Sequence, residues 1–276
     1  WLANLAVGQL GSQAFPDHLP EGAQYVLEYL FNEVFSRQTE TIRRYLLSSA
    51  VLDRFCAPLC DAVAPGLENA SAEPFNGWDF IAVIRQENLF AINLDTENHW
   101  YRYHTLFRRL LKNQLQRHYG ESTIADLHIR ASQWFADNGS VEKAIQHALL
   151  ADDLRRAVGL VARYRRQKLD EGGWFLFEKW LSLFPADAAG HDPELLIARL
   201  WNEYHQSRFE ALMPLIESAE TMLEGHSGSK DLQGELALFR GVYYAVHGDG
   251  SLSLDAIEKA REYVPDRFAA ARGMVD

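Results

Sequence analysis

The chain has 276 residues, of which 47% are apolar and 24% charged, a composition typical of an ordinary soluble protein. This length is too great for one small core and predicts two domains. The formal net charge of −11 argues against nucleic acid as the main partner, because phosphate binding requires an excess of lysine and arginine. No apolar run reaches the ~20 residues that span a bilayer, so we expect no membrane contact and a cytoplasmic location.

Residues 1–13 space their apolar side chains as one face of a helix, and we expect this helix to end a preceding domain. The chain opens on Trp1 without a basic signal segment, so we expect a section of a larger protein. Pro16 and Pro20 then mark a connector, because proline resists helix. The next apolar stripe, at about 21–35, predicts a helix.

Three short helices are predicted between this stripe and residue 88. The first can be capped by Thr39, the second runs from Cys56 to Ala64, and the third covers roughly 77–87. The small polar residues of 66–76 predict a loop. Cys56 and Cys60 lie four residues apart, and we interpret them as reduced core thiols, because a metal pair would lack further ligands.

A β-hairpin follows these helices. Residues 89–94 and 100–103 alternate apolar and polar side chains and bracket a loop of about five residues. Three short helices followed by a hairpin is the order of a winged helix, which we assign to residues 14–120.

After the hairpin the pattern is purely helical. A helix from about 105 to 118 has a leucine-rich face opposite a basic face, and a second apolar stripe follows at 124–135. Asp192 and Pro193 start a later helix, with aspartate at the cap and proline in the first turn.

A loose internal repeat runs through the second half of the chain. The segments 139–145, 209–212 and 255–260 each place small residues where a second helix must approach a first. This pattern is typical of degenerate tetratricopeptide (TPR) repeats, and it predicts a right-handed stack of helical hairpins over residues 121–276. The expected fold class is therefore mostly α, with a winged-helix domain containing one β-hairpin, followed by a TPR-like helical superhelix.

The central run of the sequence is specific enough to suggest a family. Its distinctive segments are QENLF at 86–90, WYRYHTLF at 100–107, LHIRAS at 127–132, and then Trp134, Gly139, Ala144-Ile145, His147-Ala148-Leu149, Ala151 and Asp153. These segments closely resemble the MalT-like branch of the LuxR-family transcriptional regulators, which belong to the STAND NTPase class. The resemblance covers nearly the whole chain, is strong at 86–157 and weakens after about 186. It also identifies residues 1–13 with the end of the nucleotide-binding region that precedes the winged helix.

The resemblance implies a regulatory role. Members of the family join a P-loop nucleotide domain, a winged helix, an inducer-sensing superhelix and a C-terminal DNA-binding helix-turn-helix. This chain would then be the autoinhibitory and signal-sensing middle section of an ATP-dependent activator. Its implied partners are its own nucleotide-binding domain, a small-molecule or protein inducer, and other copies when it is activated. DNA would be bound only through the C-terminal helix-turn-helix, which this chain does not contain.

No GxxxxGK[ST] segment occurs in the sequence, so we expect neither enzyme activity nor a cofactor in this chain. ATP or ADP is implied for the full-length protein alone. No HExxH or comparable metal motif is present. The third short helix carries one arginine and two acids, so we expect no DNA binding by the winged helix.

His104 is the candidate cofactor-binding residue. In the wider class, a winged-helix histidine at a comparable place contacts the phosphates of ADP, and an imidazole N–H can donate to an anion. Between His99 and Gly120 there are basic residues and no acid. The alternative is that His104 only caps the following helix and the basic side chains are solvated.

Aromatic residues of the superhelix supply the candidate ligand-binding site. Trp174, Trp180, Trp201 and Tyr204 could line a groove that stacks a sugar or a peptide. The alternative is that they pack in the core between repeats.

The alternative for the whole chain is a TPR-like protein–protein interaction scaffold with no nucleotide or DNA role.

Overall fold

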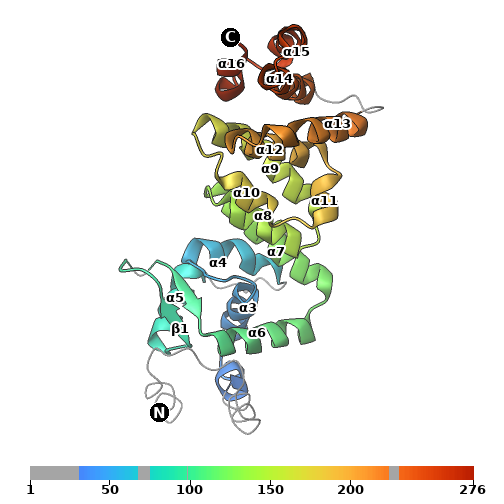
Figure 1. Ribbon diagram of the computed structural model, residues 1–276. Helices are drawn as coiled ribbons and strands as arrows, with labels where there is room; N and C mark the ends of the chain where they lie inside the picture. Colours follow the sequence, from blue (N-terminus) through green and yellow to red (C-terminus); the bar gives the residue numbers. More distant parts are fainter. Residues whose placement is uncertain (1–30, 68–74, 98, 224–229) are drawn as a thin grey trace. The chain divides into compact units, whose positions relative to one another are not determined.

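The computed structural model describes residues 31–67, 75–97, 99–223 and 230–276 (Figure 1). The chain divides into two compact units, Trp1–Ala131 and Ser132–Asp276. The helix expected at 1–13, the proline connector and most of the helix expected at about 21–35 lie outside the described residues, and residues 31–36 are helical.

The three short helices of the first unit lie where the sequence predicted them. They are α3 (Glu40–Ser49), α4 (Ala57–Val63) and α5 (Gly77–Gln86), and the 3-10 turn η1 (Ala64–Gly66) follows α4. The Thr39 side chain accepts a hydrogen bond from the Ile42 backbone N–H and so begins α3. Asn76 and Asp79 form a reciprocal capping box at the start of α5.

Close packing of α5 against α4 depends on Gly77 and Asp61. A side chain at Gly77 would collide with the Ala57 backbone carbonyl, so only glycine fits there. The Asp61 carboxylate accepts hydrogen bonds from the Gly77 N–H at 2.6 Å and the Tyr45 hydroxyl at 2.8 Å. Three helices are thereby tied together by one half-buried carboxylate.

The hairpin consists of β1 (Ala91–Asn93) and β2 (Tyr101–Tyr103), paired antiparallel with Ile92 opposite Arg102. A third extended segment, which the sequence did not reveal, joins its other side. Phe55 pairs with Tyr101 through backbone hydrogen bonds of 2.8 and 2.9 Å. Phe55, Tyr101 and Tyr103 all point into the aromatic core of the unit.

Two helices follow the hairpin: α6 (Thr105–His118) and α7 (Glu121–Asp137). The buried face of α6 consists of Phe107, Leu111 and Leu115, as its spacing predicted. The division between the two compact units falls within α7, after Ala131, whereas the sequence placed a domain boundary at residue 120. Helices followed by one hairpin and a further helix confirm the winged helix.

The second unit is entirely helical among its described residues. Its elements are α8 (Val141–Leu150), α9 (Leu154–Asp170), α10 (Leu176–Leu181), α11 (Ala186–Gly190), α12 (Pro193–His205), η2 (Phe209–Ala211), α13 (Leu212–Leu223), α14 (Lys230–Val246), α15 (Gly250–Tyr263) and α16 (Ala269–Val275). Consecutive helices pack as antiparallel pairs, α8 on α9, α12 on α13 and α14 on α15. The Asp192 side chain caps α12, as predicted.

The repeat signals mark the points where paired helices approach closely. Gly139 ends α7 in a left-handed conformation with φ of 76°. A Cβ at Gly241 would collide with Ile257 on the facing helix. Serine hydroxyls join consecutive helices at two points: Ser132 of α7 donates to the Ala144 carbonyl of α8, and Ser253 of α15 donates to the Gly241 carbonyl of α14. The predicted fold class, mostly helical with a winged helix and a helical repeat region, is confirmed.

Within the described part of the chain, no helix combines the length and the apolar character that a membrane crossing requires.

Candidate functional site

His104 lies at the junction of β2 and α6. Its backbone N–H donates to the Phe90 carbonyl at 2.7 Å, and its carbonyl accepts from the Arg108 N–H at 3.0 Å. It therefore occupies the cap position of α6, but its side chain makes no cap bond to the first turn of that described helix. The imidazole is half-buried.

Three titratable groups around α6 have lowered pKa values. Burial lowers the pKa of His104, and the Arg102 guanidinium lowers it further. Burial also lowers the pKa of Lys112, with a contribution from Arg108. The pKa of His128 falls to about 4 through burial and the charges of Lys112 and Arg108. Burial is the larger cause each time, and each of the three groups also meets a cationic neighbour, although Asp53 opposes the lowering at Lys112 and His128.

The arginines of this region divide into structural and exposed ones. The Arg108 guanidinium donates to the carbonyls of Ala50 and Val51 at 3.2 and 3.4 Å and pairs with Asp53 at 2.8 Å, so it closes the end of α3. Arg102 and Arg109, in contrast, are exposed. A neutral His104 keeps one N–H donor, and these exposed cations could approach a phosphate that it contacts.

The helix α5, which would read DNA in a DNA-binding winged helix, offers little to nucleic acid. Its exposed positions are Trp78, Asp79, Ala82, Arg85 and Gln86. Asp79 is engaged in the capping box. One cation on the exposed face is a poor match for a phosphate backbone.

The four aromatic residues proposed to line a groove occupy different environments. Trp180 is 2% exposed and packs on Phe177 with ring centroids 5.5 Å apart. Trp201 is 1% exposed and its indole N–H donates to Glu235 at 2.7 Å. These two rings lie in the core and present no face to a ligand.

Trp174 and Tyr204 are half-buried and keep some accessible ring surface. Trp174 stacks on His205 with centroids 5.0 Å apart and an interplanar angle of 12°, and Tyr204 meets the same imidazole edge-on. Burial lowers the pKa of His205, which keeps it neutral and suited to stacking. Trp174 precedes α10, which begins at Leu176, so it lies in a turn.

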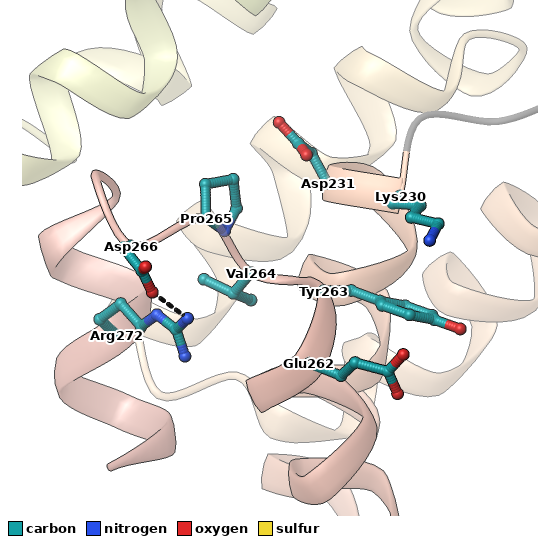
Figure 2. Close-up of a pocket in the computed structure, with 8 residues that line it drawn as sticks. All are labelled: Lys230, Asp231, Glu262, Tyr263, Val264, Pro265, Asp266 and Arg272. Carbon is teal, nitrogen blue, oxygen red and sulfur yellow. Dashed lines mark hydrogen bonds and ion pairs between the residues drawn. The ribbon is translucent and has the colours of Figure 1, made fainter.

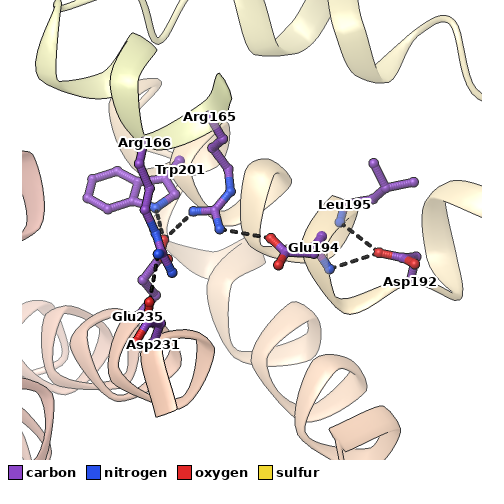
Figure 3. Close-up of polar contacts among 8 residues, drawn as sticks. All are labelled: Arg165, Arg166, Asp192, Glu194, Leu195, Trp201, Asp231 and Glu235. Carbon is purple, nitrogen blue, oxygen red and sulfur yellow. Dashed lines mark hydrogen bonds and ion pairs between the residues drawn. The ribbon is translucent and has the colours of Figure 1, made fainter. Parts of the chain in front are cut away.

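A buried ion network joins α9, α12 and α14 (Figure 3). Arg165, 1% exposed, pairs with the fully buried Glu235 and with Glu194 at 3.0 Å. Arg166 donates to the other Glu235 oxygen at 3.0 Å and pairs with Asp231 at 2.8 Å. With the Trp201 bond included, the Glu235 carboxylate accepts from three side chains. Burial alone would lower the pKa of Arg165, but Glu235 and Glu194 raise it, so the guanidinium stays charged.

This network was not expected from the sequence. One feature of the sequence does point to it: Glu235 lies on the apolar stripe that Leu232, Leu236 and Phe239 form on their helix. An acid on such a stripe requires a buried cation, although the sequence does not say which one.

A polar pocket of about 320 Å³ lies beside the junction of α15 and α16 (Figure 2). Its lining residues are Lys230, Asp231, Glu262, Tyr263, Val264, Pro265, Asp266 and Arg272. The Lys230 ammonium lies 5.6 Å from the centre of the Tyr263 ring, and Arg272 pairs with Asp266. Side chains of both signs line it, so it favours neither anions nor cations.

Among the described residues, no group of histidine, cysteine and acidic side chains could hold a metal ion. Cys56 and Cys60 are buried free thiols, as expected, and burial raises the pKa of both.

Part of the first unit is similar to known proteins. Residues 31–123 match the family model of the MalT winged helix domain. The serine/threonine-protein kinase PknK of Mycobacterium tuberculosis strain H37Rv is 36% identical over 141 residues, which is 51% of this chain and 12% of that protein. PknK of Mycobacterium bovis matches to the same extent. The aligned part therefore covers about an eighth of the length of these curated relatives.

Proposed function

We propose that this chain, whose residues 31–123 match the MalT winged helix domain, is the regulatory middle section of a LuxR-type, ATP-dependent transcriptional activator of the STAND class. The winged helix would hold a nucleotide-binding domain in its resting state. The helical unit would bind an inducer, and this binding would release the nucleotide-binding domain from its resting state. The chain itself would carry out no catalysis and would act in the cytoplasm.

One observation carries the proposal: a MalT-type winged helix presents a histidine within positively charged surroundings instead of a DNA-reading helix. His104 is half-buried at the start of α6, with the exposed Arg102 and Arg109 close in sequence. α5 has a single arginine on its exposed face. Such a surface favours the diphosphate of ADP, held by a neighbouring domain, over a DNA duplex.

The switch would follow from differential affinity. An inducer that binds the helical unit more tightly in the open state than in the closed state shifts the population toward the open state. The accessible surfaces of Trp174 and Tyr204 and the pocket of Figure 2 are the positions in this unit that support a ligand site. Trp174 is a convenient reporter, because a ligand that stacks on it changes its fluorescence.

The test uses the full-length protein and measures bound nucleotide after purification. His104→Ala should release ADP faster and raise basal transcription. The matched control is His118→Ala, which removes an exposed histidine at the other end of the same helix. Equal ADP retention in both variants would refute the role of His104. A mobility-shift assay with the present chain at low salt should detect no specific DNA complex.

The second candidate function is a TPR-like scaffold that binds a partner protein. Exposed apolar side chains on the helical unit favour it, with Phe175 62% exposed and Leu254 68% exposed. The complete reading frame separates the two functions. An upstream P-loop and a downstream helix-turn-helix support the regulator, and their absence supports the scaffold.

A further inference from the structure

The outward face of the winged-helix sheet is unusual in its chemistry. In a strand, side chains alternate between faces, and the inward face here holds Tyr101 and Tyr103, exposed by 3% and 2%. The outward face would ordinarily be polar. Instead it exposes Ile92 by 42% and Leu94 by 43%. Contact of these two apolar side chains with water is unfavourable. This indicates that another surface covers them in some state of the protein.

The backbone register defines the rest of this face. Ile92 is paired with Arg102, and the Leu94 N–H donates to the Trp100 carbonyl at 2.8 Å, so these four side chains point the same way. Arg54 joins them from the third extended segment, with its guanidinium 4.7 Å from the centre of the Trp100 ring. We call these five residues the outer wing face.

The charges of the outer wing face are all positive. Arg54 and Arg102 are exposed, and neither forms an ion pair with a carboxylate in the described part of the chain. Tryptophan and arginine surrounded by aliphatic side chains is the composition of protein-interface hot spots. A symmetric contact with the same face of another copy would bring like charges together. The complementary surface must therefore be acidic, with an apolar side chain at its centre.

The outward face of α15 has this chemistry. Leu254, Glu258 and Glu262 follow one another at intervals of four, so they lie along one side of the helix. All three are exposed, and at 68% Leu254 is more exposed than either Ile92 or Leu94. Among the described residues, neither glutamate forms an ion pair. We call these three residues the acidic helix face.

We propose that the outer wing face of one copy binds the acidic helix face of a second copy. Leu254 would pack among Ile92, Leu94 and Trp100, and the two glutamates would pair with Arg54 and Arg102. The two surfaces differ, so the contact is head-to-tail and can extend into chains of copies. This contact needs neither nucleotide nor inducer. The proposal therefore goes beyond the proposed function, and its test does not depend on that function.

The experiment is sedimentation of the 276-residue chain over about 1 µM to about 1 mM, the range of weak interfaces. The average mass should rise with concentration and fall at high salt, because exposed ion pairs are screened. Leu94→Glu should weaken association at least about tenfold by placing an acid opposite the acidic helix face. Leu254→Arg should do the same by placing a cation opposite the outer wing face. Leu150→Glu, at a site that is 58% exposed on α8, is the control and should change nothing.

Mixing the two defective variants gives the decisive result. Leu94→Glu keeps its acidic helix face and Leu254→Arg keeps its outer wing face, so an equal mixture should associate although neither variant does so alone. Circular dichroism and melting temperature establish that each variant is folded, since surface substitutions rarely alter stability by more than about 0.5 kcal/mol. A wild-type chain that stays monomeric throughout, or a mixture that stays monomeric, overturns the proposal. Association that is unaffected by both variants also overturns it.

Discussion

Neutralising Glu235 should destabilise the helical unit more than any other single change in its ion network. Glu235→Gln keeps the size of the side chain but removes the charge that faces Arg165. The two side chains are 0% and 1% exposed, so water cannot replace the lost interaction. Arg165 would keep only Glu194, which is 26% exposed, as its counter-ion.

The magnitude follows from this burial. Removing one partner of a buried pair costs about 3–5 kcal/mol, because the remaining charge is left uncompensated. Since Glu194 still faces Arg165 at 3.0 Å, we expect the lower end, about 3 kcal/mol. This corresponds to a change of more than about a hundredfold in the unfolding equilibrium. The matched control is Asp231→Asn, which removes one of the two carboxylate partners of the part-exposed Arg166 and should cost at most about 1 kcal/mol.

The assay is urea unfolding followed by tryptophan fluorescence, with Trp201 reporting directly because it donates to Glu235. With a slope of about 2 kcal/mol per molar urea, Glu235→Gln should lower the midpoint by about 1.5 M. The double variant Arg165→Met with Glu235→Gln should recover much of this loss, because it removes the uncompensated buried cation while the new amide oxygen can still accept from the Trp201 indole N–H. The reasoning fails if Glu235→Gln costs no more than Asp231→Asn, or if the double variant is less stable than the single one.

Two further predictions concern the first unit. Gly77→Ala should cost about 1–3 kcal/mol in chemical unfolding, because its Cβ would collide with the Ala57 carbonyl and force a backbone shift, whereas Gly120→Ala has open space and should be neutral. Equal melting temperatures for these two variants would contradict the close packing of α5 on α4. His128 should make stability depend on pH. Its pKa is about 4 in the folded unit against 6.5 in the unfolded chain, so the native state binds fewer protons between these values. Its contribution is fully present above pH 6.5 and is lost as the pH falls toward 4, by up to about 1.4 kcal/mol per pH unit. Midpoints measured from pH 4 to 7 should show a smaller slope in His128→Phe, and an unchanged slope would contradict the effect of burial.

Several features of this fold were accessible from the sequence because their signals are local. The helix expected at about 105–118 is α6, with its buried face on the predicted leucines and phenylalanine. Thr39 and Asp192 cap the helices they were expected to cap. The spacing of apolar residues and the chemistry of helix caps act over one or two turns. Both can therefore be recognised without knowing which element the helix packs against. His104 was found by resemblance, and its contact with a nucleotide remains a prediction.

Long-range pairing was decided by the tertiary structure. Glu235 finds Arg165 across 70 residues, and Phe55 joins β2 across 46 residues, and no local pattern specifies either partner. Burial separated aromatic residues that look alike in sequence. Trp180 and Trp201 became core, while Trp174 and Tyr204 kept accessible ring surface.

The sequence by itself determined which segments are helical, where one hairpin interrupts them, and that the second half consists of paired helices. The tertiary structure alone decided which charges are buried together and which apolar side chains remain outside. The physical reason is that helix and turn formation depend on neighbours within a few residues, whereas desolvation of a side chain depends on segments that meet only after the chain has folded.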